Sequence, residues 1–483
     1  MKTYIRYILL LVLCLIAISC SDLLDENPKS VAIENYYNTN EELKSAVNSI
    51  YLPYYSGAGG LTSYATTLEV HTDYCYGRGS NGQMNDFQGL NDANRAKTAN
   101  YWRSLYLSIR NANIVIKNAP GATSASQDLI VTYVAEAKFL RALSYFQLVR
   151  SFGGVCLRTE NNMSENDCPR STPEEIYELI ISDLLEAEIN LPDNQSDIGR
   201  PTLWAAKLLL ADVYLELQDF QKAYDKADEV IKSNNYRLVG VNSIEDFQDK
   251  VWGPTLVETS EEIFFLKHTR SPGKGNYMLW HINHIDTEAF NFGGAYGVYS
   301  ATSNPFYIAW DDDDLRKQLW IPVNFGMGDN TLVIAKFCDR ESVSMIGAGN
   351  DYPMYSYADA LLIYAEASCH IKNGPDSDAM DALNQVRRRA YGYDSNSQSP
   401  VDLTAADYDQ NTFIDLVLRE RAYEFQFVGK RWFDLKRTGT VQKTILETKG
   451  IEVAEKHLLW PIPTSEYDYN NAISPKTDQN PGY

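Results

Sequence analysis

Residues 202–233 carry the pattern of a tetratricopeptide helix pair, and this pattern restricts the possible folds more than any other part of the sequence. Two helical segments are joined by the short turn sequence LQDFQKA. Alanines where two helices cross let the helix axes approach closely. The segment therefore predicts a packed helix pair, either of the tetratricopeptide type or an ordinary helical hairpin. The residues at the expected crossing positions are Leu210, Ala211, Tyr214, Ala223 and Ala227.

Helical periodicity extends through much of the rest of the chain. One further helix is predicted by its start sequence, in which Thr172 is the cap, Pro173 opens the first turn and Glu175 completes a capping box. We therefore predict a mainly α-helical fold, with a scaffold of about four tetratricopeptide-like helix pairs, long irregular loops and a few short β-strands. The other helical segments are residues 40–51, 101–117, 131–151, 355–390 and 411–437.

Two regions interrupt the helical pattern. Residues 52–100 are rich in Gly, Asn, Ser and Tyr, and residues 236–350 combine short β-like runs, EEIFFLKH and TLVIAKF, with glycine- and aromatic-rich stretches. Both regions are too long to be ordinary connections between helices. Because long loops on a rigid frame often carry binding residues, we expect the functional site in these two regions.

The N-terminus has the pattern of a lipoprotein signal peptide. Lys2 and Arg6 precede an apolar run at residues 8–18, and Cys20 follows directly. The run is shorter than the roughly 20 residues that a membrane-spanning helix needs, so it fits a cleaved signal segment at residues 1–19. We predict that the thiol of Cys20 carries a lipid after cleavage; the alternative is a plain secretory signal with an incidental cysteine.

Composition narrows the possible partners and cofactors. The formal net charge is −21, which argues against nucleic acid as a direct partner because phosphates would be repelled. The 44% hydrophobic content predicts a globular body with a real core.

His281 and His284 form the single HxxH pair, and because no HExxH sequence is present, we predict neither a metal site nor a cofactor.

The cysteines do not predict a disulfide framework. Five lie beyond Cys20, an odd number, and no CxxC spacing occurs. A bridge between Cys156 and Cys168 is the one pairing left open. The five residues are Cys75, Cys156, Cys168, Cys338 and Cys369.

The sequence CSDLLDENP follows the leader, QNPGY stands at the terminus, and several further motifs lie between them in a fixed order. Together these motifs resemble the SusD/RagB family of outer-membrane nutrient-binding lipoproteins. Ser356 and Val428 depart from the family pattern, which usually has an arginine and a glutamate there, so a buried ion pair is expected to be missing. The motifs between the two ends are AEAKFLRALSYFQLVRSFGGV, STPEEIYELIISDLLEAEINLP, GRPTLWAAKLLLADVYLEL, YADALLIYAEA, LNQVRRRA, ERAYEFQFVGKRWFDLKRTG and WPIP.

The resemblance implies a helical fold and a place at the outer membrane of a Gram-negative bacterium, lipid-anchored and facing the cell exterior. It also implies a partner, a TonB-dependent SusC-like transporter over which the lipoprotein sits as a lid. We expect a lipidated tether at residues 20–35, an N-terminal helical part at 36–235 and a C-terminal part at 236–483, packed as one body.

The function implied is binding of a nutrient oligosaccharide and its delivery to the transporter. A peptide-binding lid of the same transporter type is the alternative, and a surface glycoside hydrolase is a weaker one. We expect no enzyme, since the sequence has no GxSxG, Walker A or HExxH motif and no particular pair of carboxylates stands out. A pure protein-interaction scaffold is a further class, which aromatic residues in the loops argue against.

Ligand contacts are expected in two glycine-rich stretches, residues 71–83 and 276–299. Sugar rings present C–H faces that stack on aromatic side chains, while their hydroxyls need planar polar partners. Many of these rings could instead pack the loops in place. The predicted ligand-binding residues are Asp73, Tyr74, Tyr76, Arg78, Asn81, Trp280, His281, Phe292, Tyr296 and Tyr299.

Two charged stretches have structural and functional interpretations. Glu420, Arg421, Glu424, Arg431, Asp434 and Arg437 alternate in sign at helical spacing, and we favour an ion-pair network because aromatic core residues lie between them. The run Asp311 to Asp314 offers carboxylates for calcium but lacks EF-hand spacing, so we favour a helix start.

Overall fold

The computed structural model describes residues 37–344 and 347–483 of the 483-residue chain. The predicted signal peptide, Cys20 and the tether therefore lie outside the described residues. Within the described ranges, no helix combines the length and apolar character needed to cross a membrane.

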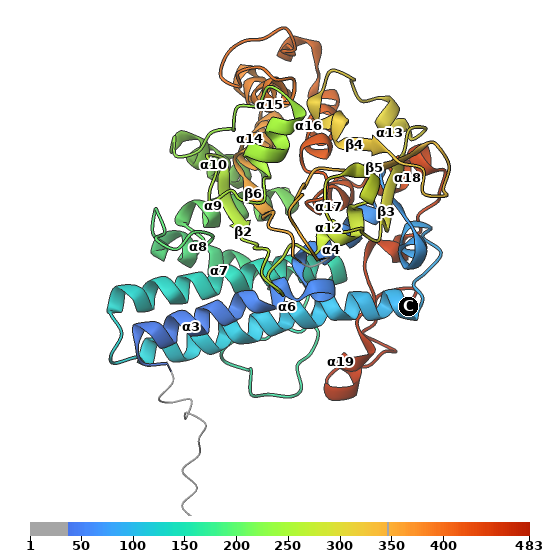
Figure 1. Cartoon of the computed structure of the whole chain (residues 1–483). Helices are drawn as coiled ribbons and strands as arrows, with labels where there is room; N and C mark the ends of the chain where they lie inside the picture. Colours follow the sequence, from blue (N-terminus) through green and yellow to red (C-terminus); the bar gives the residue numbers. More distant parts are fainter. Residues whose placement is uncertain (1–36, 345–346) are drawn as a thin grey trace, which may run out of the picture.

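The predicted mainly helical fold is confirmed, and most of the predicted helices are present. Helices α3, α6 and α7 lie together at one end of the molecule, and α8, α9, α10, α14 and α15 follow them upward in Figure 1. The main helices are α3 (Asn40–Tyr51), α4 (Leu61–Val70), α6 (Asp92–Asn118), α7 (Gln127–Phe152), α8 (Pro173–Asn190), α9 (Leu203–Glu216), α10 (Phe220–Lys232), α14 (Tyr357–Lys372), α15 (Ser377–Ala390), α16 (Gln410–Glu424), α17 (Arg431–Arg437) and α18 (Val441–Lys449). Shorter helices are α5 (Gly82–Asn85), α11 (Ile244–Asp246), α12 (Met278–Ile282), α13 (Pro305–Ile308) and α19 (Thr464–Tyr469).

Successive helices pack in tetratricopeptide-like pairs. The pairs are α3 with α6, α7 with α8, α9 with α10, and α14 with α15. The predicted crossing alanines Ala223 and Ala227 of α10 are fully buried, while the opposite face of that helix is polar. Helix α10 also packs against α14, so the stack continues across the long insertion that separates these helices in sequence.

The central helices lack a polar face because other helices cover them on several sides. Helix α9 contacts α8, α10 and α14, and nine of its residues are buried. A helix surrounded by protein has apolar residues on all of its faces, whereas a surface helix has them on only one face. The sequence LWAAKLLLADVYLE therefore belongs to an interior position in the stack.

Helix ends follow the start and stop signals of the sequence. Thr172 and Glu175 form the predicted capping box of α8, with Pro173 in the first turn. Helix α7 ends at Gly153, whose φ of 72° lies in the left-handed region that favours glycine. The start predicted for α8 is therefore present at its expected residues.

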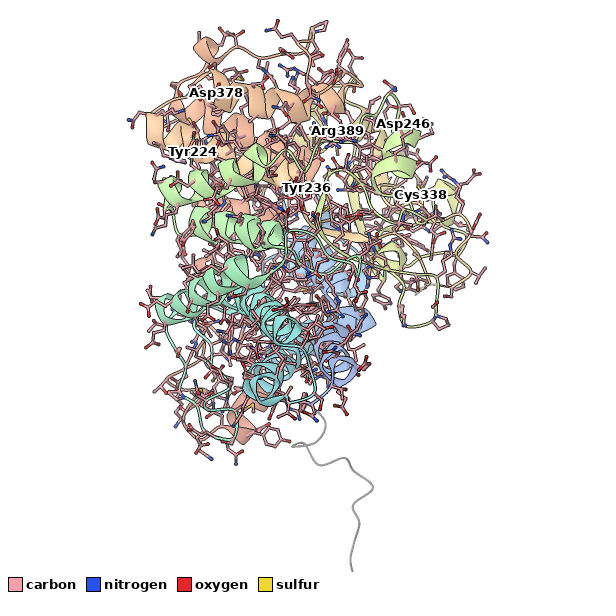
Figure 2. The ribbon with its side chains drawn as sticks, turned by 90° about the vertical axis from the view of Figure 1, so that its left-hand side faces the viewer. Tyr224, Tyr236, Asp246, Cys338, Asp378 and Arg389 are labelled. Atoms are coloured by element: carbon pink, nitrogen blue, oxygen red, sulfur yellow. The ribbon has the colours of Figure 1, made fainter. Side chains whose placement is uncertain are left out.

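Short strands form two small antiparallel sheets beside the helices. One has the strand order β1-β3-β5-β4 and the other pairs β2 with β6. The two β-like runs of the sequence correspond to β2 and β5. The strands are β1 (Tyr76–Gly77), β2 (Glu262–Leu266), β3 (Val298–Ala301), β4 (Trp320–Pro322), β5 (Thr331–Ile334) and β6 (Tyr352–Ser356). In side view the helical stack, with Tyr224 and Asp378, lies next to the loop-rich part that contains Cys338 (Figure 2).

The region at residues 52–100 is less irregular than predicted, because it contains helix α4. Every residue of α4 is buried, including Thr62, Ser63 and Glu69. Its sequence, LTSYATTLEV, has several residues of low helix propensity, so burial between other elements stabilises a helix that local preference does not favour.

The alternating charges of the C-terminal region form buried ion pairs, which confirms the structural interpretation. Arg421 Nε lies 2.8 Å from Asp434 Oδ2, and Arg437 Nη2 lies 2.8 Å from Asp434 Oδ1. Glu420 and Glu424 accept from Arg316 at 2.6 and 2.9 Å. The guanidinium groups of Arg421 and Arg437 hold the pKa of the Asp434 carboxyl far below its usual range, although burial alone would raise it.

The aspartate run begins a short 3-10 helix at Leu315–Leu319, as favoured over a calcium site. Asp314 caps it by accepting from Arg316 N at 3.0 Å, and the same carboxylate pairs with the Arg316 side chain. Asp312 pairs with Lys317 at 2.6 Å. Asp311 to Asp313 are exposed, whereas Asp314 is buried because Arg316 and Trp310 Nε1 satisfy its oxygens.

The remaining expectations on cysteines and family departures have clear outcomes. All five cysteines of the described ranges are free and buried, and Cys156 Sγ donates to the Cys168 carbonyl at 3.3 Å. Ser356 caps α14 in a capping box with Asp359, and Val428 is buried in the core. The division of the chain near residue 235 stays a prediction.

Candidate functional site

The two glycine-rich stretches predicted to contact ligand meet in one small sheet. Strand β1 pairs with β3, so that Tyr76 lies opposite Tyr299 and Gly77 opposite Val298. Just beyond the pair, Arg78 N donates to Gly297 O at 2.8 Å. A Cβ at Gly77 would lie 2.2 Å from the Asn81 carbonyl oxygen, so only glycine permits this tight turn.

Aromatic rings from three loops cluster on this sheet. The Tyr76 and Tyr299 rings are stacked with centroids 5.6 Å apart, and Phe325 lies 5.9 Å from Tyr299. Tyr296 lies 5.0 Å from Phe325 and 4.7 Å from His284. All five side chains are partly exposed. We call these five residues the aromatic cluster.

Arg78 lies over the aromatic cluster. Its guanidinium carbon is 4.4 Å from the Tyr296 ring centroid and 5.5 Å from that of Phe325. A guanidinium held over ring faces keeps its N–H edges available for a further partner. The side chain has one weak protein hydrogen bond, from Nη1 to Ala295 O at 3.5 Å.

Tyr296 adopts an uncommon backbone conformation. Its φ is 36°, in the left-handed region that non-glycine residues rarely enter. Flanking hydrogen bonds hold this turn: Ala295 N donates to Trp280 O at 2.6 Å, and Gly297 N donates to His281 O at 2.7 Å. Such strained positions occur often at binding sites, where the surrounding structure fixes a side chain in place.

Trp280 and Phe292 form a second aromatic group on the neighbouring loop. Their ring centroids are 6.0 Å apart, and 38% of Phe292 is exposed. His281 lies beside Tyr277, with ring centroids 5.2 Å apart, and burial lowers the pKa of the His281 imidazole to about 4. At neutral pH this histidine is an uncharged hydrogen-bonding group.

Asp73 and Tyr74 were expected at the ligand, but both are buried and bonded within the protein. Asp73 accepts from Arg431 Nε at 3.0 Å and from Arg431 Nη2 at 2.6 Å. The Tyr74 hydroxyl donates to Glu69, and the ring lies 4.9 Å from that of Phe306. The candidate site therefore does not include these two residues. Asn81 is also buried, and its Nδ2 donates to Gly297 O at 3.2 Å.

The sequence prediction missed four residues that belong to the site. Phe325 and His284 complete the aromatic cluster, while Lys97 and Lys449 approach it from helices α6 and α18. Phe325 follows Asn324 and precedes Gly326, which is the same Asn-Phe-Gly sequence that surrounds Phe292. The repeated tripeptide could have indicated Phe325 from the sequence. Lys97 and Lys449 lie on helices far from these loops in sequence, and no sequence pattern connects them to the site.

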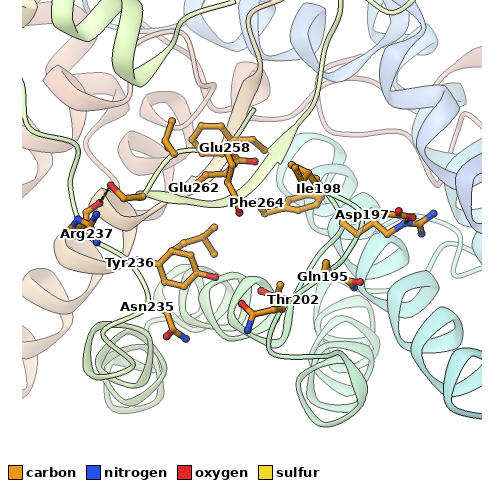
Figure 3. A pocket seen from close by; sticks show the side chains of 17 residues that line it. Gln195, Asp197, Ile198, Thr202, Asn235, Tyr236, Arg237, Glu258, Glu262 and Phe264 are labelled. Carbon is orange, nitrogen blue, oxygen red and sulfur yellow. Dashed lines mark hydrogen bonds and ion pairs between the residues drawn. The ribbon is translucent and has the colours of Figure 1, made fainter. Parts of the chain in front are cut away.

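A separate hollow of about 450 Å³ lies away from the aromatic cluster. It is bounded by the loop before α9, the residues after α10, and β2, as Figure 3 shows. Its lining is mostly polar, with paired charges at Asp197 and Glu262. Its labelled side chains include Gln195, Asn235, Tyr236, Arg237 and Glu258. This hollow provides an alternative location against which the aromatic cluster can be tested.

The described ranges contain no group of three or more His, Cys, Asp or Glu side chains arranged to hold a metal ion. His284 lies in the aromatic cluster instead, with Nδ1 accepting from Asp286 N at 3.2 Å.

Two family models match this chain in its two halves. The model described as "Starch-binding associating with outer membrane" matches residues 22–215, and the model of the SusD family matches residues 321–483. The chain belongs to the SusD/RagB family.

One curated relative matches the whole chain, and two solved structures have the same fold over more than nine tenths of it. The chain is 29% identical to SusD-like protein P2 of Formosa agariphila over the full length of both. A SusD homolog from Bacteroides thetaiotaomicron has the same fold, with a TM-score of 0.78 and 24% identity over 93% of this chain and 98% of that one. A laminarin-binding SusD-like protein superposes with a TM-score of 0.75 and 24% identity over 92% of this chain and 100% of that one.

Proposed function

We propose that this SusD/RagB protein binds an oligosaccharide at the cell surface through the aromatic cluster and passes it to a TonB-dependent transporter. The observation that carries the proposal is the β1–β3 pairing, which places Tyr76 and Tyr299 side by side, 5.6 Å apart, among partly exposed rings from three loops. Rings in this arrangement offer extended apolar faces next to polar backbone and side-chain groups.

The physical reason for a carbohydrate ligand is the match between ring faces and sugar C–H faces. A glycan is well hydrated, so each hydrogen bond to the protein contributes only about 0.5–1.5 kcal/mol net. Covering ring faces such as Tyr299 and Trp280 must therefore supply much of the binding free energy. We expect micromolar to millimolar dissociation constants, roughly −8 to −4 kcal/mol, which suits a protein that releases its ligand to a transporter.

The names of relatives support a carbohydrate over other ligands. One structural neighbour is a laminarin-binding protein, and one matching family model is described as starch-binding. The same model is described as associating with the outer membrane. Together with the leader and Cys20, this supports attachment to the outer membrane by a lipid on Cys20, on the outer face of the cell.

A glycoside hydrolase has less support at this site. Hydrolysis needs two carboxyl groups flanking the bond, about 5–10 Å apart. Asp73, the acid predicted in these loops, is bonded to Arg431 and buried. We therefore propose binding without catalysis.

The test is affinity gel electrophoresis against a panel of polysaccharides, with hydrolysis products measured in parallel. The panel contains starch, laminarin, xylan, galactomannan, polygalacturonate, alginate, chondroitin sulfate and carrageenan. We expect retardation by at least one polysaccharide and no release of reducing ends. Retardation by none of them, together with binding to a peptide library, would favour the peptide-binding alternative.

A further inference from the structure

Three cationic side chains surround the β1 turn and the aromatic cluster. Arg78 lies over Tyr296, Lys97 Nζ contacts Asn81 Oδ1, and Lys449 Nζ lies 5.2 Å from the Tyr76 ring centroid. In the described part of the chain, none of the three has a carboxylate oxygen within the 4.0 Å of an ion pair. Their protein partners are neutral: Ala295 O for Arg78, and Val70 O and Asn85 Oδ1 for Lys449.

Elsewhere, the chain pairs many of its buried cations directly with acids. Arg141 binds Asp183 at 2.7 Å, Arg316 binds three carboxylates, and Arg389 binds both Glu261 and Glu424. With a net charge of −21, the chain has acids in excess. Lys336 and Arg170 also lack a carboxylate partner, but both donate to several main-chain carbonyls. Arg78, Lys97 and Lys449 differ because all three lie around one turn, beside partly exposed aromatic rings.

Leaving these cations unpaired has a cost. Lys97 is partly buried, and this burial lowers the pKa of its ammonium to about 8; burial lowers the pKa of the Lys449 ammonium to about 8 as well. A charge removed from water without a counterion is unfavourable. The Asp73 carboxylate acts on the Lys449 ammonium without contacting it, and it is already bonded to Arg431. An incoming anion would restore the missing interaction.

The positions of these groups suit an acidic substituent on a stacked sugar. Arg78 and Lys97 flank Asn81, since Asn81 Nδ2 donates to Gly297 O beside Arg78 and Asn81 Oδ1 accepts from Lys97. A guanidinium can bind a carboxylate or sulfate through two parallel N–H bonds, whereas an ammonium acts as a point charge. Lys449 is held under the Tyr76 ring and adds positive potential without needing direct contact.

We propose that the oligosaccharide bound at the aromatic cluster is acidic, and that Arg78 and Lys97 bind its uronate carboxylates or sulfate esters. This inference rests on the proposed function and names the substrate class of the same site. Non-specific attraction is not an alternative, because the molecule as a whole repels polyanions.

The experiment starts from the strongest binder in the polysaccharide panel. We expect this to be one of the four acidic members. Its carboxyl-reduced form and, where it carries sulfate, its desulfated form are then titrated by calorimetry. The treatment that weakens binding at least tenfold identifies carboxylate or sulfate as the group recognised. A neutral polysaccharide as strongest binder, or equal binding after both treatments, would overturn the inference while leaving glycan binding intact.

Substitutions test which residues recognise the acidic group of the glycan. Lys97→Gln and Arg78→Gln should each weaken binding of the acidic glycan about tenfold and reduce its dependence on salt, because charge-assisted hydrogen bonds are lost. Lys97→Arg should restore most of the affinity. Lys443→Gln, an exposed change on the same helix as Lys449, is the matched control and should bind normally.

The stability of each variant is measured separately from its binding, as a melting temperature. Lys97→Gln should keep or raise the melting temperature, since it removes a partly buried charge that lacks a counterion. A fall in melting temperature with unchanged affinity and salt dependence would show that Lys97 is structural and would contradict the proposal. Binding to no polysaccharide at all would reject the proposed function and this inference with it.

Discussion

Asp73 and Arg431 form a two-bonded ion pair that joins the segment before β1 to helix α17, 358 residues further along the chain. Both side chains are buried, and Arg431 also donates to the Leu418 carbonyl at 3.1 Å. Because β1 begins three residues after Asp73, this pair anchors the loop that carries Tyr76 and Arg78. The anchor is a structural element beneath the site and not part of its surface.

Asp73→Asn is expected to reduce stability and to spare ligand contacts. The change leaves the Arg431 charge buried and without its partner, which costs about 3–5 kcal/mol. Urea unfolding should show a lower midpoint with an unchanged slope. Glycan binding measured well below the melting temperature should persist. Normal stability combined with lost binding would instead mean that Asp73 touches the ligand.

Trp280→Ala tests the second aromatic group. Removing the ring takes away a stacking face next to Phe292, so the affinity for the bound polysaccharide should fall roughly tenfold with little change in melting temperature. Tyr236→Ala, which alters the polar hollow of Figure 3, is the control and should bind as the unaltered protein does. Normal binding by Trp280→Ala together with weakened binding by Tyr236→Ala would place the binding site in that hollow.

Acid should destabilise the fold partly through His71. Burial lowers the pKa of His71 to about 4, and its Nδ1 lies 2.9 Å from the Thr67 carbonyl. The unfolded chain binds a proton at this residue near pH 6.5, so the free energy of unfolding falls as pH drops from about 6.5 to about 4, by up to about 1.4 kcal/mol per pH unit.

The measurement for His71 is a comparison of urea unfolding at several pH values with the variant His71→Phe. The variant should show a flatter decline between about pH 6.5 and 4, with the remaining slope due in part to His268, whose pKa burial also lowers to about 4. Glu69 acts in the opposite direction, because burial raises its pKa to about 7 and its contribution is lost as pH rises. Parallel curves for the two proteins would refute the role of His71.

Cys20→Ala tests the anchor, which rests on the leader sequence. Without the thiol the predicted diacylglycerol cannot be attached, and the variant loses about 0.8 kcal/mol of membrane binding for each buried CH2 of that lipid. The variant should leave the membrane fraction and lose incorporation of labelled palmitate. Continued labelling and retention would show that the lipid is attached elsewhere.

Local sequence rules predicted most helices because those helices follow their own caps and periodicity. Helix α3 begins and ends at the predicted residues 40 and 51, and α8 begins at the predicted capping box. Helix α4 was not predicted, since its threonines and serines disfavour helix and its stability comes from packing on all sides. Tertiary burial of that kind leaves no local pattern.

The candidate site shows the same difference between what local sequence predicts and what depends on tertiary packing. Glycine-rich stretches with clustered aromatics predicted which loops meet, because such composition marks loops that need turns and carry exposed rings. The direction of each side chain was not predictable. Tyr74 and Tyr76 are two residues apart, a spacing that would place both side chains on one face of a regular strand. The strand begins only at Tyr76, after turns and bends, so Tyr74 is buried against Phe306 while Tyr76 lies beside Tyr299. Asp73 looked like a ligand residue because its partner Arg431 is distant in sequence.

The most direct test of the account is a crystal structure of the protein with an oligosaccharide of its strongest-binding polysaccharide. We predict density for sugar rings against Tyr76, Tyr299 or Tyr296, with an acidic group within hydrogen-bond distance of Arg78 or Lys97. Density confined to the hollow beside Tyr236, with the aromatic cluster empty, would contradict the central claim.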